Sequence, residues 1–241
     1  MRLSVNLNKV ALIRNSRGAD YPNLVQVARD CEAFGAQGIT IHPRPDQRHA
    51  RYDDVMALKE VCTTELNIEG YPTKEFNDVV LAARPDQVTL VPDEPGQLTS
   101  DHGWDTVGRA DYLRGVIDTF KAAGIRTSIF VDPEEKMLDG ALATGTDRIE
   151  FYTGPFAHRF PTDPAAAVAP FTRASAYARD LGLGINAGHD LNLDNLTYFA
   201  GRMPGLQEVS IGHALVTDAL YHGLANTIRM YLSCLHNASM R

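Results

Sequence analysis

The sequence predicts a (β/α)₈ TIM barrel with additional helices, a fold in which eight parallel strands alternate with helices. Eight short apolar, β-branched runs recur along its 241 residues, and helical patterns separate most of them. No glycine-rich GxGxxG turn and no phosphate-binding loop of the Walker type occurs, which disfavours an open doubly wound sheet. No linker, low-complexity tract or block of charge divides the chain, so we expect residues 1–241 to form a single barrel domain.

The strands are expected where the apolar runs occur, at residues 3–7, 38–42, 65–69, 87–91, 126–131, 148–152, 184–187 and 208–211. The clearest helical patterns cover residues 21–36, 111–124, 133–145, 163–182 and 224–241. Helix-stopping glycines precede the next strand at Gly124, Gly145 and Gly182. Asp132 and Asp163 each stand directly before a proline, which predicts helix starts with proline in the first turn.

Two connections are longer than a barrel needs, residues 92–110 after the fourth strand and residues 153–164 after the sixth. Long loops after barrel strands lie on the catalytic face and often act as lids. Surface irregularity would explain either segment equally well.

Composition excludes several classes of protein. The 30 acidic and 23 basic residues give a formal net charge of -7, which argues against wholesale nucleic-acid binding but leaves room for a local anion site. The three cysteines have no metal-binding or redox spacing, so we expect them to be reduced packing residues. No signal peptide and no run of the ~18 apolar residues of a membrane span occurs, and we expect a cytoplasmic protein without a membrane partner.

Polar side chains follow six of the predicted strands, and a barrel brings the carboxyl ends of its strands to one mouth. These residues are Asn6, Asn8, Lys9, His42, Arg44, Glu69, Glu150, His189 and His213. Histidine and buried glutamate exchange protons near neutral pH, so the set predicts acid–base chemistry. The alternatives remain open: Glu69 and Glu150 would also serve in structural ion pairs, His49 would also be a solvated side chain, and Arg14 is expected to be structural.

The segments "NAGHD" and "SIGHA" both place Gly-His between a strand and a helix near the end of the chain. Barrels often bind phosphate after strands seven and eight, through backbone N–H groups and a helix N-terminus. Across the mouth, Arg17, Arg44 and His49 are candidates to hold a second anion. The pattern predicts one or two phosphorylated metabolites as ligands.

Seven segments in order resemble one family over almost the whole chain: "VNLNKVALIRNSRG", "GITIHPRPDQRH", "LNIEG", "LVPDEPGQLTSDHGWD", "IEFYTG", "INAGHDLNLDNL" and "IGHALV". This is the pyridoxine 5'-phosphate synthase family. The resemblance implies a barrel with extra helices, assembled as an octamer that is built from dimers. It implies condensation of 1-deoxy-D-xylulose 5-phosphate with 3-amino-2-oxopropyl phosphate to pyridoxine 5'-phosphate, phosphate and water. It implies no metal and no organic cofactor.

The resemblance also implies residue roles. His42 and Glu69 match the proton acceptors of the family, His189 matches the proton donor, and Glu150 matches a carboxylate that stabilises the transition state. The residues that match contacts to the amino-ketone phosphate are Asn6, Arg17, Gly212 and His213. Those that match contacts to the deoxyxylulose phosphate are Arg44, His49 and Thr99.

Two positions depart from the family pattern. Asn8-Lys9 stands where Asp-His is common, and both side chains can still bind a sugar phosphate. Asp190 stands where glycine often lends its backbone to the ligand. A carboxylate there would repel phosphate, so we expect it to turn away and cap a helix that starts near Leu191.

Two other functions compete with the synthase. A metal-dependent barrel hydrolase would use His42, Glu69, His189 and His213 as ligands, but it usually carries an HxH pair on the first strand. A non-enzymatic phosphometabolite-binding module would have lost its chemistry through Asn8-Lys9. The final helix leaves assembly open, since its apolar stripe would pack equally well on its own barrel or on a partner. The stripe is formed by Leu224, Ile228, Tyr231, Leu232 and Leu235.

Overall fold

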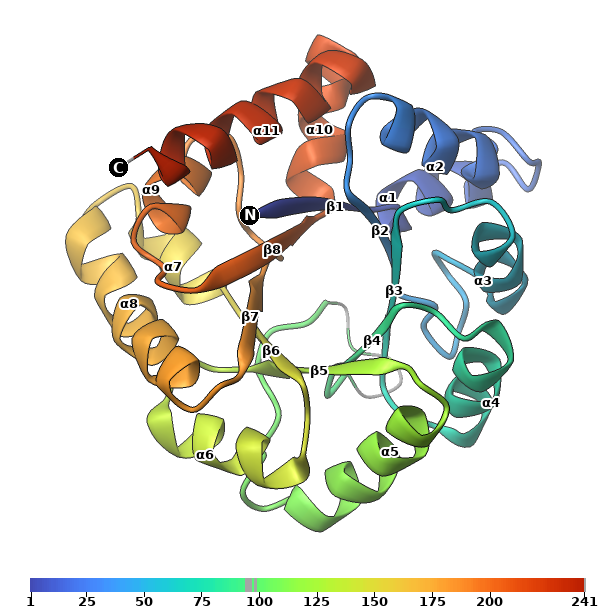
Figure 1. Cartoon of the computed structure of the whole chain (residues 1–241). Helices are drawn as coiled ribbons and strands as arrows, with labels where there is room; N and C mark the ends of the chain where they lie inside the picture. Colours follow the sequence, from blue (N-terminus) through green and yellow to red (C-terminus); the bar gives the residue numbers. More distant parts are fainter. Residues whose placement is uncertain (94–96, 98, 241) are drawn as a thin grey trace.

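The computed structural model describes residues 1–93, 97 and 99–240, and within them eight parallel strands close into a barrel in chain order (Figure 1). This closed parallel barrel confirms the predicted (β/α)₈ fold. The strands are β1 (Arg2–Asn6), β2 (Gly38–Ile41), β3 (Glu65–Gly70), β4 (Gln87–Leu90), β5 (Arg126–Val131), β6 (Arg148–Phe151), β7 (Gly184–Ala187) and β8 (Leu206–Ile211).

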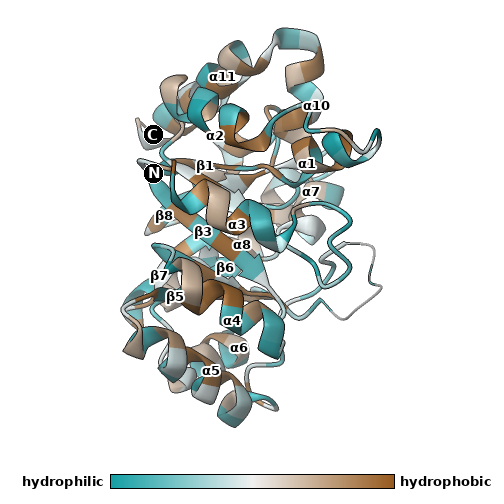
Figure 2. Ribbon diagram, turned by 90° about the vertical axis from the view of Figure 1, so that its right-hand side faces the viewer, coloured by the Kyte–Doolittle hydropathy of each residue, from teal (hydrophilic) through white to brown (hydrophobic). Residues whose placement is uncertain are grey.

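The helices surround the barrel. They are α1 (Asn8–Asn15), α2 (Leu24–Ala33), α3 (Tyr52–Lys59), α4 (Lys74–Ala83), α5 (Ala110–Ala122), α6 (Glu135–Thr144), α7 (Gly154–Arg159), α8 (Pro164–Asp180), α9 (Leu196–Ala200), α10 (His213–His222) and α11 (Leu224–Ser239). None of the described helices is long and apolar enough to cross a membrane. In the side view of Figure 2 the N-terminus lies on the left, and α1 and α7 lie towards the right, where the strands end.

Two connections differ from the sequence-based expectation. The segment after the sixth strand is not a plain long loop, because α7 occupies half of it. The first strand is followed at once by α1, which begins at Asn8 without a side-chain cap. Of the expected loop at residues 92–110, residues 94–96 and 98 lie outside the described part of the chain.

Local signals set several helix ends. The glycines at the three predicted stops have left-handed φ values of 77°, 79° and 82°, which glycine adopts without a steric cost. Asp163 caps α8, since its Oδ1 accepts a 3.0 Å hydrogen bond from the N–H of Ala166. The predicted helix start at Asp132 is wrong. Its carboxylate accepts the N–H of Gly103 at 3.1 Å, and α6 begins only at Glu135.

The apolar core lies between the strands and the helices. Alternate strand residues such as Ile39 and Ile68 are fully buried in one cluster with helix residues such as Leu24 and Phe120. Because successive strand residues face opposite sides of a sheet, the polar residues between them face the inside of the barrel. The hydrophobic driving force therefore holds the helices against the outside of the barrel.

Polar side chains bond across the inside of the barrel. The hydroxyls of Ser4 and Thr40, on β1 and β2, lie 2.7 Å apart. On β3 and β4, Thr89 donates a 3.0 Å hydrogen bond to Oδ1 of Asn67. These bonds satisfy polar groups that would otherwise be costly to bury inside the barrel.

The apolar stripe of α11 packs on its own barrel. Ile228, Tyr231 and Leu235 are buried, and Leu224 and Leu232 pack against the same core as partly buried residues. The hydroxyl of Tyr231 donates a 2.7 Å hydrogen bond to Asp218 of α10. Packing within the chain thus accounts for the stripe that the sequence left open.

Candidate active site

Five predicted site residues end strands at one mouth of the barrel. Asn6 ends β1, His42 follows β2, Glu69 lies near the end of β3, Glu150 lies in β6, and His189 follows β7. The Nδ2 of Asn6 donates a 3.3 Å hydrogen bond to Oε2 of Glu69. The Nδ1 of His42 lies 4.0 Å from the same oxygen. Residues 63 positions apart in the chain thus meet on one carboxylate.

Burial shifts both His42 and Glu69 towards their neutral forms. Burial raises the pKa of Glu69 to about 7, although the nearby charge of His189 lowers it. Burial lowers the pKa of His42 well below its ordinary value, and the charges of Arg44 and His49 lower it further. The 4.0 Å contact is therefore not an ion pair at neutral pH. Instead, His42 is available as a base, and Glu69 can take up and release a proton near pH 7.

Burial favours the neutral, protonated form of Glu150. It is 4% exposed, and its Oε2 has no hydrogen-bond partner among the described residues. Burial raises its pKa well above the ordinary value, and repulsion from Glu69 and Glu208 raises it further. Gly188 lies against this carboxyl group. A Cβ at that position would meet the carbonyl oxygen of Ser210 at 2.1 Å and Oε1 of Glu150 at 3.2 Å, so only glycine fits.

His189 is contacted through both ring nitrogens. Its Nδ1 lies 2.8 Å from Oδ2 of Asp190, and its Nε2 lies 3.1 Å from Oγ1 of Thr99. The prediction that Asp190 caps a helix near Leu191 is wrong. The next helix begins only at Leu196, and the carboxylate turns back to the neighbouring imidazole.

The carboxylate of Asp190 changes the acid–base behaviour of His189. Burial lowers the pKa of His189, but the hydrogen bond and the charge of Asp190, together with the charges of Glu69 and Asp93, outweigh it and leave the pKa above its ordinary value. Conversely, burial raises the pKa of Asp190, but the hydrogen bond from His189 lowers it below its ordinary value. The site therefore contains two histidines whose pKa values are shifted in opposite directions, His42 downward and His189 upward.

The side-chain amide of Asn8 forms hydrogen bonds with the backbone of His42. Its Nδ2 donates a 3.0 Å hydrogen bond to the carbonyl oxygen of His42, and its Oδ1 accepts a 2.9 Å hydrogen bond from the His42 N–H. These two bonds imitate one rung of a β-ladder just beyond the end of β2. The amide thereby fixes the backbone that carries the base.

A cationic cluster consists of Lys9 with Arg44 and Arg48, which follow β2, and the ring of His49 lies beside these charges. Burial lowers the pKa of Lys9, and the charges of Arg44 and Arg48 lower it further. Burial lowers the pKa of His49 to about 4, with Lys9 and Arg48 adding to the effect. The Nδ1 of His49 is buried without a hydrogen-bond partner among the described residues. Mutual repulsion of this kind is relieved by an anion, so the cluster suits a phosphate group.

Asp93 is a site residue that sequence reasoning missed. Its Oδ2 accepts hydrogen bonds of 2.5 Å from Arg44 and 2.6 Å from Ser100. The other guanidinium nitrogen of Arg44 and that of Arg48 both donate to the carbonyl oxygen of Gln97. The available signal was the position of Asp93, directly after the fourth strand run, where catalytic-face residues are expected.

The remaining predicted residues lie nearer the surface. Gly212 precedes α10 against Asn6, where a Cβ would meet that side chain at 3.1 Å, and exposed His213 opens the helix. Arg17 is exposed in a turn after α1. Its guanidinium makes no hydrogen bond or ion pair to the described residues, so the structure does not join it to the mouth. Among residues 1–93, 97 and 99–240, no three His, Cys, Asp or Glu side chains are arranged to hold a metal ion.

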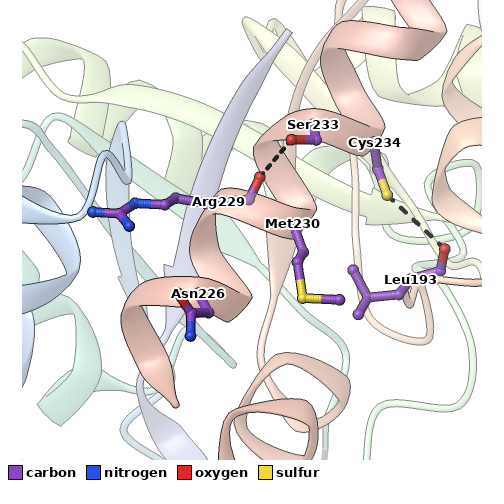
Figure 3. A pocket seen from close by; sticks show the side chains of 6 residues that line it. All are labelled: Leu193, Asn226, Arg229, Met230, Ser233 and Cys234. Atoms are coloured by element: carbon purple, nitrogen blue, oxygen red, sulfur yellow. Dashed lines mark hydrogen bonds between the residues drawn. The ribbon is translucent and has the colours of Figure 1, made fainter. Parts of the chain in front are cut away.

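A separate hollow of about 480 Å³ lies between α11 and Leu193, which precedes α9. Figure 3 shows Met230 and Cys234 of that helix directed towards Leu193, with Arg229 pointing away. Cys234 donates a long 3.9 Å hydrogen bond to the Leu193 carbonyl oxygen. None of the predicted site residues lines this hollow, so it is distinct from the mouth of the barrel.

Comparison with known proteins identifies the family. The family model described as pyridoxal phosphate biosynthesis protein PdxJ matches residues 3–237. The chain belongs to this family. A relative from Bacteroides fragilis named pyridoxine 5'-phosphate synthase is 59% identical over 234 residues, which cover 97% of this chain and 99% of the relative. Relatives of the same name come from Parabacteroides distasonis, with 58% identity over 98% and 99% of the two chains, and Porphyromonas gingivalis, with 59% over 95% and 97%.

Solved structures with low sequence identity share the barrel. Thiamine phosphate pyrophosphorylase from Pyrococcus furiosus matches with a TM-score of 0.64 and 14% identity, covering 98% of this chain and 96% of that chain. Phosphoribosyl anthranilate isomerase from Thermus thermophilus matches with a TM-score of 0.61 and 13% identity, and the match covers both chains completely. At such identities the likeness concerns the fold alone.

Proposed function

We propose that this PdxJ-family chain, an enzyme that forms pyridoxine 5'-phosphate, does so at the mouth of its barrel in the cytoplasm. It condenses 1-deoxy-D-xylulose 5-phosphate with 3-amino-2-oxopropyl phosphate and releases inorganic phosphate and water. The observation that carries the proposal is the opposite tuning of two histidines, since the pKa of His42 lies well below and that of His189 above the ordinary value. Pairs of groups tuned apart in this way divide base and acid roles between them.

His42 and Glu69 act as proton acceptors. Condensation of an amine with a carbonyl group, followed by ring closure, requires protons to leave nitrogen and carbon and to reach departing oxygen. Neutral His42 takes a proton, and Glu69, whose pKa is about 7, takes up and returns protons at working pH. Their separation of 4.0 Å at Nδ1 and Oε2 allows one substrate atom to face both groups.

His189 acts as the proton donor, and Glu150 acts as a neutral hydrogen-bond donor. Protonated His189 gives a proton to an oxygen that leaves as water or phosphate. The pKa of Glu150 is raised by burial, so its carboxylic acid can donate a hydrogen bond to negative charge that develops on the substrate. This differs from the role of a charged carboxylate, which the resemblance implied for Glu150.

Two anion sites hold the substrates. Lys9, Arg44 and His49, with Arg48, bind the phosphate of the deoxyxylulose substrate, and Thr99 contacts the same substrate. Gly212 and His213 at the start of α10 bind the phosphate of the amino ketone through backbone N–H groups and the helix N-terminus. Asn6, Asn8, Arg17 and Asp190 complete the proposed binding residues.

The proposal includes assembly into a homo-octamer, a tetramer of dimers. Its support is apolar surface on two helices that contact each other, α1 and α10. Leu12 and Ile13 of α1 are exposed, and Leu220 and Tyr221 of α10 are 74% and 84% exposed. Light scattering on the purified protein should give a mass near eight chains. A monomer at micromolar concentration would remove this part of the proposal.

The deciding experiment is product formation by the purified protein from both substrates. Pyridoxine 5'-phosphate should appear together with inorganic phosphate. Turnover should fall about 10²-fold or more in His42→Ala, Glu69→Ala and His189→Ala. The matched control is His222→Ala, which removes an exposed histidine at the end of α10 and should leave turnover unchanged.

Two outcomes would favour the alternatives. Stoichiometric zinc in the purified protein, with activity lost on chelation, would favour the metal-dependent hydrolase. A folded wild-type protein that binds both phosphorylated substrates and forms no product would favour the binding module.

A further inference from the structure

His189 and Asp190 are neighbours in sequence, and the geometry of their contact determines the tautomer of the His189 ring. An ionised carboxylate only accepts hydrogen bonds, so Nδ1 of His189 donates to Oδ2 of Asp190 across 2.8 Å. This leaves Nε2 as the nitrogen that faces the mouth. The hydroxyl of Thr99, 3.1 Å from Nε2, marks where a hydrogen-bonding group of a substrate would lie.

The backbone and a neighbouring ring hold this arrangement. His189 has a left-handed φ of 32°, which is rare for a residue with a Cβ and occurs at functional sites where the surroundings enforce it. The ring of Tyr152, just after β6, meets the His189 ring edge-on with centroids 5.9 Å apart. The imidazole is thus restrained from a second element as well as from its own loop.

The charged and titratable groups around this pair come from several elements. Glu69 of β3 and Asp93 after β4 favour a positive charge on His189, whereas His42 after β2 opposes it. His213 at the start of α10 faces Asp190 and favours its ionised form. Among these groups, Asp190 alone forms a hydrogen bond to the His189 ring within the described part of the chain.

We propose that Asp190 is a positioning residue for His189: its carboxylate fixes the ring with Nε2 towards the substrate and holds the ring in its protonated form for proton donation. The inference rests on the proposed role of His189 as the proton donor. It gives a function to the Asp190 carboxylate, at a position where the family pattern often has a glycine whose backbone contacts the ligand. An aspartate that directs one ring nitrogen and stabilises an imidazolium is the arrangement that serine hydrolases use for their catalytic histidine.

The test compares wild type with Asp190→Asn, in which the side chain keeps its size and loses its charge. The pKa of His189 is measured by ¹⁵N NMR on histidine-labelled protein, with the resonance assigned through His189→Gln. We expect this pKa to fall by about one unit. Because only protonated His189 donates, the fall of kcat with rising pH should begin about one pH unit lower. At pH 8 kcat should be about 10-fold below wild type, whereas KM for either substrate changes less.

Asp194→Asn is the matched control, because it removes the same charge from an exposed side chain of the same loop. It should leave the His189 pKa and the pH profile unchanged. An unchanged His189 pKa in Asp190→Asn would overturn the inference even if activity fell. If instead His189→Gln kept full activity, the proposed donor role would fail, while the pKa comparison would still decide whether Asp190 controls the ring.

Discussion

The two ends of the barrel bury the same kind of carboxylate in opposite surroundings. At the N-terminal end, Glu65 of β3 meets Arg2 at 2.6 Å and also pairs with Arg126. At the C-terminal end of the same strand, Glu69 meets the neutral amide of Asn6 at 3.3 Å and the neutral ring of His42 at 4.0 Å. One strand therefore carries a charge-paired carboxylate at one end and a carboxylate without a close guanidinium at the other.

The two carboxyl groups therefore differ in role: Glu65 contributes to stability, whereas Glu69 is available for proton exchange. Paired guanidinium groups keep a buried carboxylate ionised, so its proton is not available for exchange. Without such a pair, burial raises the pKa of Glu69 to about 7 and that of Glu150 well above its ordinary value. Glu208 stands between these cases: burial raises its pKa while Arg2, Arg148 and Arg126 lower it. Glu69 and Glu150, which have no guanidinium partner among the described residues, both lie near the carboxyl ends of their strands at the mouth of the barrel.

The largest effect should come from Glu69→Gln. The amide keeps the shape of the side chain and cannot exchange a proton, so turnover should fall about 10²–10⁴-fold. Steady-state product formation measures the loss, and circular dichroism checks the fold. Activity within about 3-fold of wild type would mean that the two ends do not differ in chemical role.

Glu65→Gln should give the opposite result. It leaves guanidinium groups of Arg2 and Arg126 without their carboxylate, which should lower the free energy of unfolding by about 3 kcal/mol. Because the N-terminal end is remote from the mouth, kcat should stay within about 3-fold of wild type. Urea denaturation and steady-state rates on one preparation test both expectations, and a stability equal to wild type would contradict the pairing argument.

The pH dependence of stability should distinguish Glu69 from its amide. The pKa of Glu69 is raised from 4.5 to about 7 on folding, so the folded state binds the proton more tightly. Its contribution is fully present below about pH 4.5 and is lost as pH rises through 7, by about 3 kcal/mol. Relative to wild type, Glu69→Gln should therefore gain stability between pH 5 and 8. A pH-independent difference from denaturation curves would contradict the raised pKa.

Asn8→Ala should have a smaller effect that is confined to the mouth. It removes both hydrogen bonds to the His42 backbone, each of about 1 kcal/mol. With the base less well placed, kcat should fall about 10-fold and KM should change less. The control is Asn23→Ala, which removes the N-cap of α2 and should lower stability by about 1 kcal/mol without changing kcat. An effect of Asn8→Ala on KM alone would indicate a direct substrate contact instead.

Lys9→Met should have the smallest effect. It removes one cation from a cluster that retains two guanidinium groups. KM for the deoxyxylulose substrate should therefore rise about 5-fold, and kcat should stay unchanged. The difference from wild type should shrink at high salt, which screens the attraction. Lys74→Met, at an exposed lysine paired with Asp78, is the control and should change neither constant. A larger effect on the amino ketone would reassign the cluster.

Much of the fold was predictable because its signals are local. The β-branched runs that became the strands, the glycines that end helices, and the Asp163-Pro164 start of α8 each act within a few residues. The meeting of the strand-end residues at one mouth followed from the predicted fold, since parallel barrel strands point the same way. The start of α1 at Asn8 was missed, because that helix follows β1 directly and has no capping side chain.

The barrel, the family and the residue types at the mouth could be predicted from the sequence, because each depends on short-range patterning or on segments in a fixed order. The pairings that give those residues their chemistry arise only in the folded chain. Arg44 meets Asp93 across 49 positions and Asn6 meets Glu69 across 63, distances at which no local pattern operates. Even Asp190, adjacent to His189, accepts a hydrogen bond from the imidazole and does not cap a helix, because a carboxylate bonds to whichever donor the folded backbone brings within reach.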